Sequence, residues 1–167
     1  SLFVSNVASN GGAVQIPSGT ARIAACDFLN NTAGEGGAIS STSNNTFIAA
    51  CRFISNTGTS GGAMWLIGRQ NIASSVFVRN VALQRGGAVY AQGNTVFANN
   101  TVYANAALID GGGFATIGGL PKIDNCVFWS NTDNAGGLFQ AQIRAAGGVP
   151  SVNTSCVDGW VATLGGS

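Results

Sequence analysis

The chain has 167 residues, of which 46% are hydrophobic, 25 are glycine and only 8% are charged. So large an apolar fraction excludes a disordered chain, because disorder requires low hydrophobicity and high net charge. The net charge of +1 gives no reason to expect nucleic acid as a partner, and the absence of any run of 18 apolar residues predicts no membrane insertion.

The first recurring motif is an aromatic or aliphatic residue followed three positions later by asparagine. Its copies are Phe3 with Asn6, Phe28 with Asn31, Phe53 with Asn56, Phe77 with Asn80, Val102 with Asn105 and Phe128 with Asn131. Short apolar runs between Asn, Gly, Ser and Thr are typical of strands and turns. We interpret the six asparagines as a structural ladder at a bend, because an unsatisfied buried amide costs about 1–3 kcal/mol.

A pair of glycines follows each copy of this motif. Six such pairs recur at a constant interval, from Gly11-Gly12 and Gly36-Gly37 (36 − 11 = 25) to Gly136-Gly137. A fixed period in this range indicates a repeat protein in which each unit stacks on the last. An apolar column comes next in each unit: Val14, Ile39, Met64, Val89, Phe114 and Phe139.

A further apolar column precedes the next aromatic and completes the unit. It consists of Ile23, Ile48, Ile72, Phe97 and Ile123. Units of about 25 residues with two or three short strands predict an all-β fold, a right-handed parallel β-helix (β-solenoid) of six to seven coils. Right-handed crossovers are strongly preferred between parallel strands. We expect residues 1–167 to form a single domain of this kind.

The cysteines fall near the aromatic column. Cys26 and Cys51 share one column on adjacent coils, and Cys126 and Cys156 are also expected to be neighbours. Two interpretations remain open: buried free thiols, or disulfides between coils, which would imply an oxidising compartment. The chain has no histidine and no Cys-x-x-Cys spacing, so we expect neither a metal site nor a cofactor.

The charged residues predict ion pairs rather than catalysis. Asp27 and Arg52 differ by 25 residues, as do Arg85 and Asp110, so each pair should lie side by side on adjacent coils. A polysaccharide lyase or hydrolase needs several carboxylates or basic groups in one cleft. The column beside Asp124 contains only alanine, so we expect no enzymatic activity; a polysaccharide-active enzyme is the more distant alternative.

Trp65 and Tyr90 occupy an outward column on adjacent coils. Exposed aromatic rings stack on sugars or on protein surfaces. This pair is therefore the candidate contact for a glycan or a protein partner, and a carbohydrate-binding module is the nearer alternative function.

The GGAV, GGAI, GGAM and GGAV segments at 11, 36, 61 and 86, alternating with F-x-x-N, resemble the repeats of the chlamydial polymorphic outer-membrane proteins. The pattern is similar to β-helical repeats of other bacterial autotransporter passengers. The resemblance implies an extracellular or cell-surface location and a structural or adhesive role. A β-helix leaves unpaired strand edges at its ends, and neither end shows an amphipathic helix or a charged cap. We therefore expect head-to-tail self-association, or pairing with repeats of a parent protein.

Overall fold

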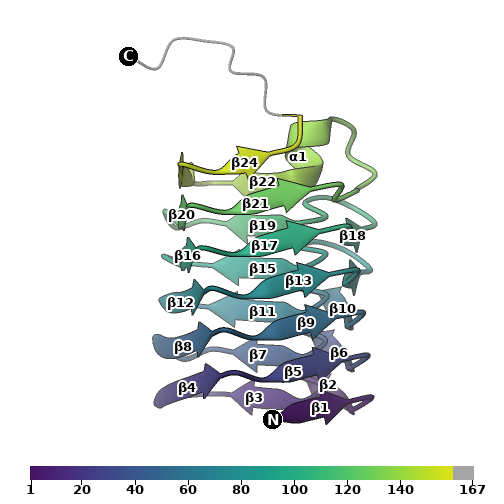
Figure 1. Cartoon of the computed structure of the whole chain (residues 1–167), viewed down its shortest axis with the longest axis vertical. Coiled ribbons are helices and arrows are strands. Elements are labelled where there is room, and N and C mark those ends of the chain that lie inside the picture. The colour runs from purple at the N-terminus through teal and green to yellow at the C-terminus, as the bar shows by residue number, and fades with distance from the viewer. Residues whose placement is uncertain (160–167) are drawn as a thin grey trace.

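The computed structural model describes residues 1–159, and they form a parallel β-solenoid of about six turns (Figure 1). As the chain climbs from the N-terminus, the strands at the front of Figure 1 run to the right and those at the back run to the left. This sense of winding is right-handed. The predicted fold is therefore confirmed, including its handedness.

Each complete coil carries four short strands, not the two or three that the sequence suggested, and equivalent strands stack into four parallel sheets. Sheet A contains β1 (Leu2–Val4), β5 (Asp27–Leu29), β9 (Arg52–Ile54), β13 (Val76–Val78), β17 (Thr101–Tyr103), β21 (Val127–Trp129) and β24 (Cys156–Val157). Sheet B contains β2 (Val7–Asn10), β6 (Thr32–Glu35), β10 (Thr57–Ser60), β14 (Val81–Ala82) and β18 (Ala106–Ala107).

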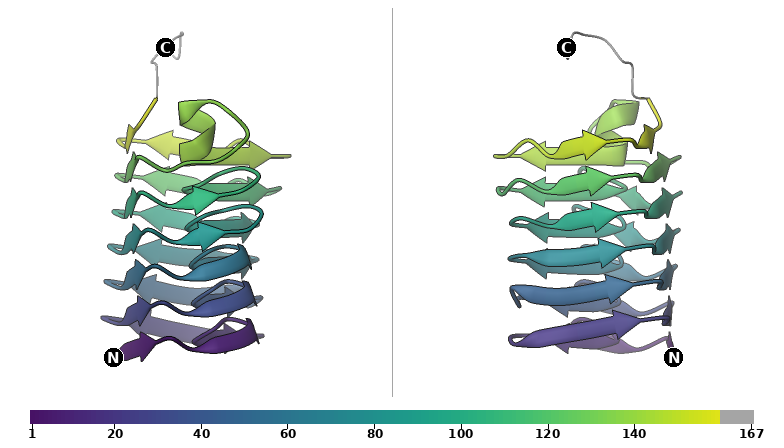
Figure 2. Two further views of the ribbon diagram at one scale, coloured as in Figure 1. Left: turned by 90° about the vertical axis from the view of Figure 1, so that its right-hand side faces the viewer. Right: turned by 60° about the vertical axis from the view of Figure 1, so that its left-hand side comes forward.

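The other two sheets complete the coil. Sheet C contains β3 (Val14–Ile16), β7 (Ile39–Ser41), β11 (Met64–Ile67), β15 (Val89–Gln92), β19 (Phe114–Ile117) and β22 (Ile143–Ala146). Sheet D contains β4 (Thr20–Ala24), β8 (Asn45–Ala49), β12 (Gln70–Ala73), β16 (Val96–Ala98), β20 (Lys122–Asp124) and β23 (Ser151–Asn153). The coils of the solenoid lie as nearly level layers in both views of Figure 2.

Residues one repeat apart are vertical neighbours. Ile23 pairs with Ile48, which pairs in turn with Ile72 in sheet D. In sheet A, Phe53 pairs with Phe77 although this interval is one residue shorter than the regular period. The strand register is kept in spite of the shorter interval, because a slip by one residue would turn every core side chain outward.

The core is a set of apolar columns inside the four sheets. The rings of Phe3, Phe28, Phe53 and Phe77 stack with centroid separations of 4.8, 4.8 and 4.9 Å. These separations match the spacing of neighbouring strands, about 4.8 Å, so ring stacking and backbone pairing share one repeat distance. Burying each such side chain contributes about 1.5–3 kcal/mol.

The glycine pairs allow the turn between sheets B and C. Gly36 has a φ of +64°, a backbone region that residues with a Cβ rarely adopt. A Cβ on Gly37 would overlap the carbonyl oxygen of Gly62 on the next coil. The first glycine therefore supplies the turn conformation, and the second allows adjacent coils to approach closely.

The last coil departs from the predicted pattern. Phe114 pairs with Ile143 (143 − 114 = 29), so Phe139 does not join its column. Instead Phe139 lies in a short helix, α1 (Leu138–Gln142), at the C-terminal end of the stack (Figure 2). The expectations that this end lacks a helix and that Gly136-Gly137 continues the glycine stack were wrong. The segment is longer than one repeat, and its extra residues leave the coil as α1.

The described cysteines are free thiols. Cys51 and Cys126 are buried, whereas Cys156 is exposed. Val127, not Cys126, pairs with Cys156, so the two cysteine side chains point to opposite faces of sheet A. The two residues are neighbours in the backbone, as expected, because the N–H of Cys156 donates to the carbonyl oxygen of Cys126 at 2.8 Å, but their thiols do not face each other.

Candidate functional site

The six motif asparagines form a continuous ladder of hydrogen bonds along the bend between sheets A and B. The side-chain amide of Asn56 donates to Oδ1 of Asn80 at 2.9 Å and to the carbonyl oxygen of Phe28 at 2.9 Å. The backbone N–H of Asn56 donates to the same Oδ1 atom, also at 2.9 Å. The ladder comprises Asn6, Asn31, Asn56, Asn80, Asn105 and Asn131. Each side-chain amide donates a hydrogen bond to the next coil, so these residues join the coils and their amide groups are already bonded within the protein.

Trp65 and Tyr90 pair directly in sheet C, on the face that points away from the core. Trp65 is partly exposed, but Tyr90 is only 9% exposed. Burial raises the pKa of the Tyr90 hydroxyl, an effect that Arg85 opposes and Asp110 reinforces. Tyr90 therefore presents little ring surface to a ligand, and contact through this pair stays a prediction.

The carboxylate of Asp110 lies beside this column between two guanidinium groups. Its oxygens are 3.3 Å from Nε of Arg85 and 3.7 Å from Nε of Arg144. The sequence predicted the first contact, but it missed Arg144, which belongs to the longer last coil. Asp133 accepts a hydrogen bond from the backbone N–H of Gly111. The cluster thus holds Asp110 in ion-pair contact with two cations, and Asp133 lies beside it on the backbone of Gly111.

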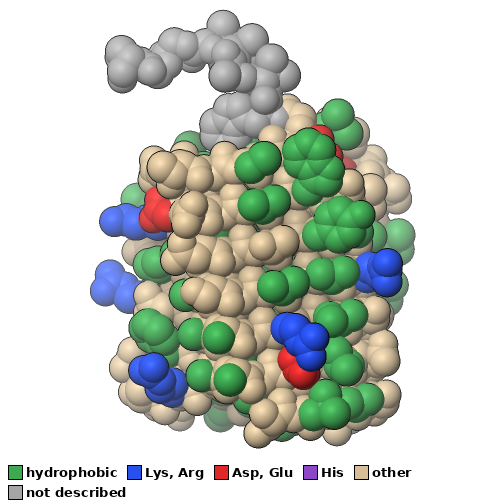
Figure 3. All heavy atoms as spheres, in the orientation of Figure 1, with side chains coloured by type: hydrophobic (Ala, Val, Ile, Leu, Met, Phe, Trp, Pro, Cys, Tyr) green, Lys and Arg blue, Asp and Glu red, His purple; other side chains and the backbone are tan. Residues whose placement is uncertain are grey.

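An apolar stripe runs along the outer face of sheet A, with exposed side chains at Val4, Tyr103 and Trp129 and half-buried ones at Leu29, Ile54 and Val78. One residue in each of six neighbouring strands of this sheet contributes to it. Each of these residues directly follows the first residue of the motif. We call this set the sheet A stripe: Val4, Leu29, Ile54, Val78, Tyr103 and Trp129. Figure 3 shows hydrophobic side chains gathered along this face of the molecule.

The aromatic end of the sheet A stripe is well exposed. Tyr103 is 44% exposed and Trp129 is 47% exposed, and they pair on adjacent coils. Five intervals of about 4.8 Å make the stripe about 24 Å long. Sequence reasoning missed it, although the same repeat period that reveals the buried aromatic column also reveals the residue after it.

The column next to the stripe contains one ion pair. Asp27 and Arg52 form two hydrogen bonds, of 2.7 and 2.6 Å, on adjacent strands. The Arg52 guanidinium lowers the pKa of the Asp27 carboxyl below its usual value. The predicted pairing is thus present, and it leaves the stripe flanked by a neutralised pair of charges.

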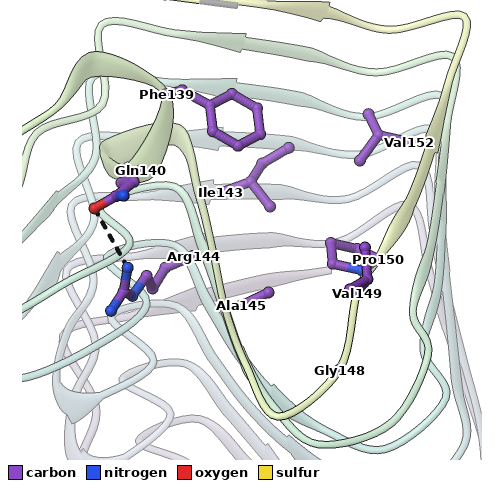
Figure 4. A pocket seen from close by; sticks show the side chains of 9 residues that line it. All are labelled: Phe139, Gln140, Ile143, Arg144, Ala145, Gly148, Val149, Pro150 and Val152. Atoms are coloured by element: carbon purple, nitrogen blue, oxygen red, sulfur yellow. Dashed lines mark hydrogen bonds between the residues drawn. The ribbon is translucent and has the colours of Figure 1, made fainter. Parts of the chain in front are cut away.

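A pocket of about 490 Å³ opens at the C-terminal end of the core (Figure 4). Ile143 and Val152 form its floor as the last members of two core columns, and Phe139 of α1 forms a wall. The pocket is therefore the end of the apolar core. The segment from Trp160 to Ser167, including the trailing end predicted from Val161 onward, lies outside the described residues.

Two further findings concern residues 1–159. No group of three or more His, Cys, Asp or Glu side chains could hold a metal ion there. No helix in that part of the chain has the length and apolar character needed to cross a bilayer.

Comparison with protein families gives one match. Residues 25–42 match the Chlamydia polymorphic membrane protein repeat. The matched segment contains one F-x-x-N motif, Phe28 with Asn31, and the glycine pair that follows it. The resemblance recognised in the sequence is therefore confirmed for this repeat. Comparisons with curated proteins and with solved structures gave no match.

Proposed function

We propose that this chain is a non-enzymatic structural and adhesive β-solenoid of an extracellular or cell-surface protein. The sheet A stripe is the observation that carries the proposal. Its six apolar residues face outward on successive coils, although polar residues there would leave the core unchanged. Exposed apolar surface of this extent marks an interaction site in a soluble protein. The matched repeat supports the location.

The solenoid gives this contact surface a rigid support. Every coil is joined to the next by strand pairing in up to four sheets and by the asparagine ladder. A rod of this kind keeps Tyr103 and Trp129 at a fixed spacing without the entropy cost of ordering a loop on binding. The geometry therefore suits adhesion better than catalysis.

Lateral self-association fits this structure better than head-to-tail stacking at the C-terminal end. Ala106 of β18 forms one bridge with Thr132, and the residue next to Thr132, Asn131, bonds to Gln142 of α1 instead of to a further coil. We propose that copies associate through their sheet A stripes. Sedimentation velocity at rising concentration should show a weak dimer, and a single monomeric species up to millimolar concentration would contradict this part of the proposal.

Adhesion itself is tested with beads coated with the protein and applied to cultured epithelial cells under flow. The variant Tyr103→Thr/Trp129→Thr removes both aromatic rings and puts β-branched threonine, which favours strands, at both positions. We expect its adhesion to fall by about fivefold or more, since aromatic residues dominate contact surfaces. The control Leu83→Thr/Leu108→Thr removes two exposed apolar side chains outside sheet A and should adhere like the parent protein. Equal adhesion of the parent and the aromatic variant would refute the proposal.

A further inference from the structure

Basic side chains recur along sheet D at every second coil. Arg22 and Lys122 lie in one outward column, on β4 and β20, and Arg69 lies just before β12 between them. Two coil spacings of about 4.8 Å separate successive members, so the charges repeat at about 10 Å along the rod. Figure 3 shows basic side chains spaced along one edge of the molecule in this way.

Two of these cations line one groove. Arg69 and Lys122 border a groove of about 560 Å³ on the outer side of sheet D. Asn71, Asn94 and Val96 also line it, and Oδ1 of Asn94 accepts a 2.8 Å hydrogen bond from the backbone N–H of Leu120. The groove thus combines positive charge with neutral hydrogen-bonding groups.

The three cations have no ion-pair partner among residues 1–159. The acidic groups that form ion pairs there contact Arg52, Arg85 and Arg144 instead. Arg22 lies over the ring of Phe47, 5.6 Å from its centroid. Asp124 shares a strand with Lys122, but its Oδ1 accepts a 2.7 Å hydrogen bond from Asn153. Asp124 keeps its own negative charge, because a hydrogen bond from a neutral amide does not neutralise a carboxylate, but it forms no ion pair with Lys122. Among the described residues, Arg69 and Lys122 are therefore exposed, unpaired cations of the groove.

We propose that this groove binds an acidic polysaccharide that lies parallel to the rod. Arg69 and Lys122 lie two coils apart, so a polymer with spaced anionic groups can contact both while it runs along the rod. The amides of Asn71 and Asn94 then face the sugar hydroxyls. The site uses sheet D, so it is independent of the contact proposed for sheet A.

Other polyanions fit the groove less well. Recognition of anionic lipid uses clusters of about 4–8 basic residues, more than this face offers. Single-stranded nucleic acid binds on aromatic rings that stack with its bases, and the ring on this column, Phe47, does not line the groove. Sparse charge with neighbouring amides favours a carbohydrate.

The test measures binding of the purified protein to immobilised heparin, polygalacturonate and neutral dextran at low salt. The variant Arg69→Gln/Lys122→Gln removes both groove charges from exposed positions. We expect its affinity for the acidic polymers to fall about tenfold or more, because each lost contact removes a Coulomb attraction. The control Arg52→Gln/Arg79→Asn removes two positive charges away from sheet D and should bind like the parent.

Each outcome decides the proposal. Binding of heparin and polygalacturonate, lost only in the groove variant, supports recognition of any anionic sugar, and binding of heparin alone supports recognition of sulfate. An equal loss in the control variant would mean attraction by net charge only and would overturn the proposal. So would binding of dextran, stronger binding of a single-stranded oligonucleotide, or no binding at all.

Discussion

The side-chain amide of Asn131 donates to Oε1 of Gln142 at 2.6 Å, so the asparagine ladder ends on a residue supplied by α1. The backbone N–H of Asn131 donates to the same oxygen at 3.2 Å. Gln142 returns a hydrogen bond from Nε2 to the carbonyl oxygen of Asn131 at 3.0 Å. A glutamine thus takes the place of the next asparagine while its backbone belongs to a helix instead of a coil.

Replacing Gln142 with leucine should loosen the last coils and leave the first ones unchanged. The substitution deprives the buried amide of Asn131 of its acceptor, at a cost of about 1–3 kcal/mol. In a solenoid each coil contacts only its neighbours, so the effect stays local. Hydrogen exchange should accelerate in β21 and β22 but not in β5 or β9. Uniform acceleration along the chain would show that the ladder end controls global stability.

Removing one asparagine from the middle of the ladder should destabilise the whole rod. In Asn80→Ala, the buried Asn56 amide loses its acceptor and the carbonyl oxygen of Phe53 loses a donor. We expect the free energy of unfolding to fall by about 2–4 kcal/mol, as measured by urea titration. Asn71→Ala, on the outer face, is the matched control and should change it by less than about 0.5 kcal/mol. Similar losses in both variants would contradict a role for the ladder.

Two glycine substitutions separate close coil packing from backbone conformation. Gly62→Ala places a Cβ against the carbonyl oxygen of Gly87, and the backbone of Val81 is also close, so adjacent coils must move apart. Gly136 has a φ of +77° but open space around its Cα, so Gly136→Ala should cost only about 1–2 kcal/mol. Thermal unfolding should show a much larger drop in Tm for Gly62→Ala, and equal drops would contradict close packing at the glycine stack.

The cysteines should react with a thiol reagent in an order set by burial. Cys156 is exposed and should react rapidly with Ellman's reagent at pH 8 in the folded protein. Burial raises the pKa of Cys126 to about 11, so that thiol is almost entirely protonated at pH 8 and should react only after unfolding. Cys156→Ser should abolish the fast phase. Cys26 is partly exposed and should react more slowly than Cys156, so a phase of unchanged rate in this variant would show that an interior thiol is accessible.

The burial of Cys126 should also make the free energy of unfolding depend on pH in the alkaline range. The folded protein holds the Cys126 proton more tightly than the unfolded chain, whose thiol has a pKa of about 9. The contribution to stability is therefore full below pH 9 and declines as the pH rises towards about 11. Cys126→Ser should reduce this decline in urea titrations at successive pH values. An unchanged pH dependence would mean that other groups, such as Cys51 or Tyr90, account for it.

The register of the solenoid could be predicted because identical residue types occupy identical positions. Phe28, Phe53 and Phe77 stack as the period requires, and Asn56 bonds to Asn80. Strand pairing and core packing both depend on that period, so one sequence signal predicted both. The number of sheets was not predictable from it, since sheet B strands such as β14 and β18 contain only two residues.

The outer face was predicted less well because exposure depends on what lies above a residue. Tyr90 and Tyr103 both point away from the core, yet Tyr90 is buried and Tyr103 is exposed. Arg85 and Asp110 lie near enough to Tyr90 to influence the pKa of its hydroxyl, and nothing in the column spacing indicates its burial. Arg144 was missed for a different reason: the extra residues before it shift the last coil out of the period.

The equivalence of the coils also bears on how such a gene can change. Phe28 meets Phe53 in the same way that Phe53 meets Phe77, so recombination between two copies of the repeat would delete or duplicate one entire layer. The remaining layers would still match, because each layer buries the same types of side chain against the next. The length of such a rod can therefore change by one coil at a time while the residues of its core stay the same.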